Sequence, residues 1–139
     1  MIIQIISAFF ATFFFAIIFN ISKQHLILCG LTGAIGWSVF LFSKNYFESI
    51  VISNFLGALA VSFVSHFLAK NKKTPVTVFL ISGIIPLVPG AGMYKTIYYT
   101  ITKNYSLANY YGIQSLQIAG VISIAIVLLD TFTKLKNKV

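Results

Sequence analysis

The chain has 139 residues, of which 58% are hydrophobic, 16% aromatic and only 9% charged, whereas soluble domains carry about 25% charged residues. Its net charge of +8 comes from ten lysines and no arginine, and these lysines separate apolar stretches instead of lining one face, which argues against a nucleic acid partner. The composition therefore predicts a single transmembrane domain over residues 1–139, embedded in a lipid bilayer.

Five apolar segments approach the roughly 20 residues that a membrane-spanning helix needs. No basic residue precedes the first segment, and its apolar stretch is longer than the core of a typical signal peptide. We therefore expect it to be retained as a span. The second is short and rich in glycine, and it is either a full span or a re-entrant, strongly packed helix. In chain order the expected spans are residues 2–19, 26–42, 48–69, 75–94 (broken at 86–92) and 112–132.

The lysines predict the orientation of these spans. With five spans, seven lysines lie on the side of the carboxyl terminus and three on the other side. Because positive charge marks the cytoplasmic side, we expect the amino terminus outside and the carboxyl terminus inside. A four-span arrangement without the second segment weakens this contrast.

Two segments carry faces of small or polar residues. The second repeats small residues that allow helices to approach closely in lipid, and the third carries an inward-facing polar stripe at four-residue spacing, because lipid cannot satisfy polar groups. This stripe either makes interhelical hydrogen bonds or lines a polar pathway. The predicted packing residues are Gly30, Gly33, Ala34, Gly36, Ser38, Ala58 and Ser62, and the polar stripe is Asn54, Ala58, Ser62 and His66.

The fifth segment contains Gln117, which lies deep enough to need a polar partner, whereas Gln114 lies nearer the membrane boundary. Asp130 precedes Lys134 by four residues, the spacing of a helical ion pair. No acidic residue lies near the middle of a span, and the sequence offers no nucleophile–base pair, paired carboxylates or metal cluster. We therefore expect no enzyme activity, no metal and no cofactor.

Residues 84–94 read IIPLVPGAGMY and predict a break in the fourth span. Pro86 and Pro89 cannot donate to the carbonyl groups of Ser82 and Ile85, which would leave both carbonyls available. A helix restarting after Pro89 would open its first amides toward an anion; these belong to Gly90, Ala91 and Gly92. The alternative is a proline kink that only improves packing. We expect residues 93–112 to form the outer end of this helix and an interfacial loop.

The motif IIPLVPGAGMY resembles the signature of the threonine/serine exporter family. FFFAIIFNISKQHLILCGLTGAIGW near the amino terminus, and Asn54 followed by FLGAL, resemble it too. The likeness is to the second membrane domain of the fused exporters, which also exists as a small separate subunit. The resemblance implies a subunit of a small amino acid exporter in a bacterial-type inner membrane, with a larger membrane companion. It places Pro86, Pro89, Gly90 and Gly92 in the family's motif. From the residues themselves, we expect the amides at the break to hold a substrate carboxylate, with Asn54 and Gln117 as further candidate contacts.

Three alternatives remain open from the sequence. The chain could be a structural subunit that stabilises its companion without transporting. It could belong to an exporter of another small carboxylate, such as a dicarboxylate, although no arginine or mid-membrane lysine is present to balance a second charge. It could also form a homo-oligomeric channel.

Overall fold

The computed structural model describes residues 1–136, and this part of the chain is helical, with no strand. This confirms the prediction of an all-α protein. The α-helices are α1 (Ile2–Ile18), α2 (Leu26–Phe47), α3 (Ile50–Lys72), α4 (Thr77–Ile84), α5 (Gly90–Ile101) and α6 (Tyr105–Lys136), and two short 3₁₀ helices are η1 (Lys23–His25) and η2 (Ile85–Leu87).

Three helices in the described residues are long and apolar enough to cross a membrane, namely Lys23–Phe47, Ile50–Lys72 and Tyr105–Leu135. A fourth crossing results if the bent pair Thr77–Leu87 and Gly90–Ile101 is counted as one span. Helix α1 is apolar but has only 17 residues, at the lower limit for a spanning helix. The chain is therefore a multi-pass membrane protein.

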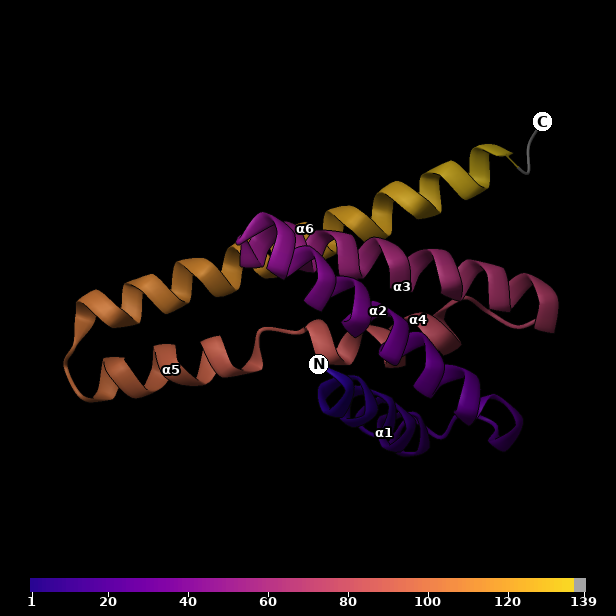
Figure 1. The fold of residues 1–139 in the computed structure, drawn as a ribbon, viewed down its shortest axis with the longest axis horizontal. Helices are drawn as coiled ribbons and strands as arrows, with labels where there is room; N and C mark the ends of the chain where they lie inside the picture. The colour runs from indigo at the N-terminus through magenta and orange to yellow at the C-terminus, as the bar shows by residue number, and fades with distance from the viewer. Residues whose placement is uncertain (137–139) are drawn as a thin grey trace.

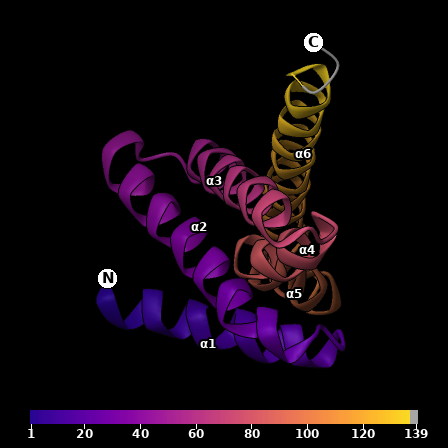
Figure 2. The same cartoon turned by 90° about the vertical axis from the view of Figure 1, so that its right-hand side faces the viewer.

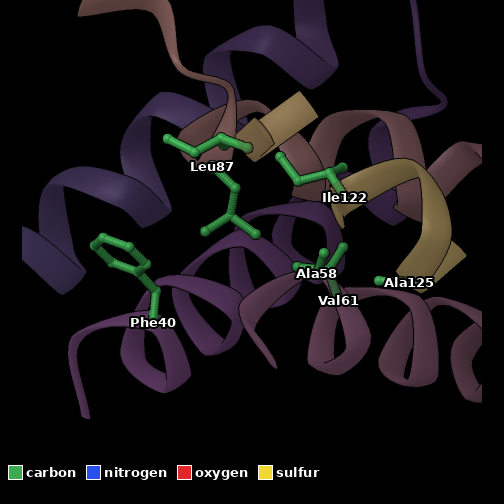
Figure 3. Close-up of a cluster of buried hydrophobic side chains, with 7 residues drawn as sticks. Phe40, Ala58, Val61, Leu87, Ile122 and Ala125 are labelled. Carbon is green, nitrogen blue, oxygen red and sulfur yellow. The ribbon is translucent and has the colours of Figure 1, made fainter. Parts of the chain in front are cut away.

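Helix α3 is central, because it packs against α2 on one side and α6 on the other (Figures 1 and 2). Helix α1 packs on α2, and α4 lies against α2 and α3. The main apolar core lies between α2, α3, η2 and α6. Figure 3 labels six of its residues, Phe40, Ala58, Val61, Leu87, Ile122 and Ala125, and the seventh is Ile118.

Glycines allow the closest of these helix contacts. A methyl group on Gly33 of α2 would collide with Thr12 of α1, and one on Gly36 would collide with Val61 of α3. Gly30 is also buried, whereas Ala34 and Ser38 are only half-buried and Ser38 Oγ donates to the carbonyl of Ala34 at 2.7 Å. The closest contacts of α2 therefore follow its glycines rather than the four-residue repeat.

Within residues 93–112 the outer end of the helix is present as expected, but the expectation of an interfacial loop is wrong. Helix α5 continues to Ile101, and α6 begins at Tyr105, so the connection is only a three-residue turn. The resulting hairpin of α5 and the first part of α6 extends beyond the turn between α2 and α3 (Figure 1). Tyr99 and Tyr111 stack across it at 5.7 Å between ring centroids, so aromatic contacts between the two helices stabilise this segment as a hairpin.

Candidate functional site

The proline–glycine motif forms a break between two helices. Helix α4 passes into η2, which ends at Leu87, and α5 restarts at Gly90 with its axis turned by 48°. Val88 between them is extended, with φ −61° and ψ 132°. A proline at position 89 favours this geometry, because proline disfavours a helical conformation at the residue before it.

The carbonyl groups expected to be free at the break are both occupied. The amide of Ile85 donates to the carbonyl of Ser82, and the amide of Val88 donates to the carbonyl of Ile85 at 3.2 Å. These are the shorter i to i+3 bonds of a 3₁₀ helix, which satisfy carbonyls that an α-helix would leave open at its end. The expectation that these two carbonyls lack a backbone donor is therefore wrong.

The amides at the start of α5 are only partly free. The amide of Gly90 donates to the carbonyl of Val88 at 2.8 Å, and Met93 makes the first helical bond, to the carbonyl of Pro89 at 3.0 Å. The amides of Ala91 and Gly92 lie between these two and have no acceptor one turn earlier in the helix. Two donors, rather than three, are thus available at this positive helix end.

A cavity of about 190 Å³ lies against the break. It brings together Asn54 and seven residues of the motif, while α2 and α6 supply the remaining walls. None of the lining side chains is charged. The lining residues are Trp37, Phe40, Asn54, residues 86–92, Gln114, Ser115 and Ile118.

Three of the expected site residues lie outside this lining. Ser82 is fully buried, and its hydroxyl donates to the carbonyl of Val78 at 3.1 Å. Ile85 is half-buried in η2. Gln117 is exposed on α6, and it is Gln114, three residues earlier, that lines the cavity.

Asn54 and Trp37 supply polar groups to the cavity walls. Asn54 is 4% exposed, and its Nδ2 donates to the carbonyl of Ile50 at 2.8 Å, which leaves its side-chain oxygen for another donor. The indole nitrogen of Trp37 is buried and has no hydrogen-bond partner among the described residues. A buried indole N–H usually finds a hydrogen-bond partner. Trp37 is not among the site residues predicted from the sequence, although it is the only tryptophan in the sequence.

The two glycines of the motif differ in their surroundings. A methyl group on Gly92 would collide with the hydroxyl of Ser115 on α6, whereas one on Gly90 would meet nothing within 4 Å. Gly92 therefore permits the contact between α5 and α6 that closes the cavity. No steric need explains Gly90.

A second cavity, of about 310 Å³, is also lined by Trp37 and Pro86. Its remaining lining comes from α1 and includes Gln4 and Ser7. Trp37 and Pro86 line both cavities. These two side chains thus form the wall between the break and the groove along α1.

The inward stripe on α3 is buried at Asn54, Ala58 and Ser62. His66 at its end is half-buried, and its Nε2 lies 3.7 Å from Oδ1 of Asp130 on α6. The predicted ion pair between Lys134 and Asp130 is confirmed at 2.7 Å. The described residues contain no group of three or more His, Cys, Asp or Glu side chains that could hold a metal.

A multi-pass helical protein with a helix break beside an uncharged cavity is typical of membrane transport proteins. The sequence profile of the family described as Threonine/Serine exporter, ThrE, matches residues 4–132. The chain therefore belongs to the threonine/serine exporter family, which is a family of transporters. No solved structure matches it.

Proposed function

We propose that this chain is one part of an exporter of small amino acids such as threonine and serine, and that it works with a larger membrane companion. Family membership supports the class of substrate. The observation that carries the assignment of the site is the cavity at the break, where the start of α5 meets Asn54 of α3.

The substrate carboxylate is held by the two amides of Ala91 and Gly92. These amides carry the positive end of the α5 dipole, and broken helices present such ends to substrate carboxylates in other transporters. The side-chain oxygen of Asn54 is an acceptor for the substrate ammonium or hydroxyl group. A cavity of about 190 Å³ is below the roughly 300–1,000 Å³ of drug-sized pockets, which suits a small metabolite.

An uncharged lining disfavours a dicarboxylate. The cavity is lined by the amino end of one helix, α5, and no lysine or histidine is among the described residues that line it. A second carboxylate would therefore lie at low dielectric without a countercharge, which is costly. A companion would have to supply that charge.

The exposed face of α6 supports the proposal of a companion. Gln117, Gly120 and Ser123 lie along this face, and all three are exposed. A methyl group on Gly120 would meet nothing within 4 Å. Because lipid cannot satisfy a glutamine side chain, a neighbouring helix packed on this face would stabilise it through its polar and small residues.

The proposed topology has five spans in a bacterial-type inner membrane. Helix α1 is the first span, and α4, η2 and α5 together make a broken fourth span. The amino terminus lies outside and the carboxyl terminus inside, which the distribution of lysines supports.

Efflux of labelled threonine from loaded cells tests the proposal. The cells make this chain alone, a companion alone, or both, and the membrane level of each chain is measured in parallel. Efflux only with both chains is expected. Efflux from this chain alone would instead indicate a homo-oligomeric channel, and absence of efflux with both chains present would exclude threonine as substrate.

A site variant separates transport from a purely structural role. Asn54→Leu removes the acceptor in the cavity while keeping a similar volume. We expect efflux to fall while both chains still assemble. Loss of assembly with this variant would instead favour a subunit that only stabilises its companion.

A further inference from the structure

A groove of about 690 Å³ lies between α3 and α6, far from the break. It lies where α6 diverges from α3 toward the carboxyl-terminal ends of both helices (Figures 1 and 2). We call it the α3–α6 groove. The residues that matter for its chemistry are Phe63, His66, Phe67, Lys70, Thr74 and Phe132.

The α3–α6 groove has an apolar part and a polar part, in a fixed order along α3. Phe63 and Phe67 are 64% and 60% exposed and lie one turn apart. Lys70 follows on the same face, about 10 Å nearer the end of the helix than Phe63, given a rise of 1.5 Å per residue. The aromatic walls therefore point toward the membrane interior, and the lysine lies at its boundary.

Helix α6 and the turn after α3 also contribute an apolar wall and a polar end to the groove. Phe132, which is 69% exposed, provides an apolar wall. Thr74, in the segment after α3, lines the polar end, and its hydroxyl is buried with no partner among the described residues. This hydroxyl is a donor that a ligand in the groove could use.

The charges around the polar end sum to a positive value. Asp130 is the one acidic side chain that faces this region among the described residues, and it is paired with Lys134 at 2.7 Å and lies 3.7 Å from His66. Lys70 has no acidic partner in the described residues, and Lys72 and Lys73 follow it on the chain. The groove thus offers the ammonium group of Lys70 to a ligand, while Asp130 is already paired with Lys134.

We propose that the α3–α6 groove binds one anionic phospholipid. The phosphate contacts Lys70 and Thr74 at the polar end, and an acyl chain runs along Phe63, Phe67 and Phe132 toward the middle of the bilayer. Basic pockets between transmembrane helices bind anionic headgroups in this way. This inference goes beyond the proposed function, since it requires only that the chain lies in a membrane.

The order of polar and apolar residues distinguishes a lipid from other occupants. A free phosphate or a soluble carboxylate would use the lysine but gain nothing from three exposed aromatic rings. A companion helix would cover the rings but would not require a cation at the boundary. A phospholipid matches both parts at once, in the orientation that the bilayer imposes.

Native mass spectrometry of the purified full chain tests the proposal. Phosphatidylglycerol and phosphatidylcholine with identical acyl chains are added in separate titrations, and glycerol phosphate serves as a headgroup without chains. We expect phosphatidylglycerol to bind more tightly than phosphatidylcholine. We also expect no competition from glycerol phosphate, because it cannot use the aromatic walls.

Two variants locate the binding. Lys70→Gln should weaken phosphatidylglycerol binding about fivefold, the effect of one lysine near a membrane surface, and Lys70→Arg should retain it. Phe67→Ala should weaken binding through the chain contacts, and both side chains are exposed, so folding is preserved. Lys44→Gln is the control with the same change of charge. Lys44 is exposed and lies near the end of α2, close to the start of α3 and therefore at the other end of α3 from Lys70.

Three outcomes would overturn the proposal. Equal losses for Lys70→Gln and Lys44→Gln would show a general attraction between charges rather than a site. Equal binding of the two lipids would remove the role of the headgroup charge. Displacement of the lipid by glycerol phosphate would show that the groove binds a soluble phosphate.

Discussion

Individual glycines decide how closely the helices approach one another. Where a neighbouring side chain already occupies the space of a methyl group, alanine forces a shift, and in a packed interior such overpacking costs about 1–3 kcal/mol. Where the space is empty, alanine costs nothing and gains helix propensity. The glycines of this chain fall into both groups.

Gly33→Ala should lower the stability of the protein, because its methyl group would collide with Thr12. We expect a loss of about 1–3 kcal/mol. Gly120→Ala, on the exposed face of α6, is the matched control and should be neutral or slightly stabilising. Thermal unfolding in detergent, followed by circular dichroism, measures both; equal melting temperatures would contradict the described contact between α1 and α2.

Gly92→Ala should impair efflux more than Gly90→Ala, since only Gly92 faces a neighbouring side chain. The collision is with the hydroxyl of Ser115, whose Cβ would lie at an ordinary 3.7 Å. Ser115→Ala should therefore restore part of the efflux lost by Gly92→Ala. Efflux assays on the single and double variants test this, and a double variant no better than Gly92→Ala would refute the contact.

At the scale of elements, the break depends on prolines and on a tightened turn. Pro89 prevents α4 and α5 from forming one continuous helix. The carbonyls of Ser82 and Ile85 accept hydrogen bonds from the amides of Ile85 and Val88 in the 3₁₀ turn. The break therefore leaves the amides of Ala91 and Gly92 without a backbone acceptor, while the carbonyls of Ser82 and Ile85 are paired. This is the arrangement that an anionic group requires.

Pro89→Ala should reduce efflux while leaving the membrane level of the chain near normal. Alanine restores an amide that can bond to the carbonyl of Ile85, and it relaxes the extended conformation of Val88. Both effects favour a straighter helix and a smaller cavity. Pro75→Ala, before the start of α4, removes a proline outside the break and should retain efflux; an equal loss in both variants would contradict a special role for the break.

At the scale of the whole molecule, α3 holds the chain together. It contacts α2 and α6, contributes Asn54 to the cavity at the break, and carries Lys70 in the α3–α6 groove. The two proposed binding sites therefore lie toward opposite ends of one helix. They can be altered separately.

The proposed orientation predicts which end of α3 reagents can reach. In a Cys29→Ser background, Asn45→Cys should react with a membrane-impermeant thiol reagent on intact cells, because it lies on the proposed outer side. Asn71→Cys should react only after the membrane is permeabilised. Both positions are exposed, so the reverse pattern would place the amino terminus inside.

Hydrophobic length, the proline–glycine motif and local spacing were readable from the sequence. The all-helical fold and the membrane class follow from the composition, and the pair of Asp130 and Lys134 follows from helical periodicity. Family membership follows from the motif and its surroundings. These properties depend on composition or on residues that are near one another in the chain. They can therefore be predicted without knowing how the helices pack.

The lining of the cavity depended on how the helices are rotated and how closely they pack. Periodicity gave no means to choose Gln114 over Gln117, because that choice is made by the rotation of α6 against α5 and α3. Trp37 joins the cavity only because α2 lies against η2. The approach of His66 to Asp130, the 3₁₀ bonds at the break and the α3–α6 groove likewise arise from contacts between segments distant in sequence or from local backbone geometry. Local sequence patterns do not encode the contacts between distant segments, because these contacts arise only when the helices pack together.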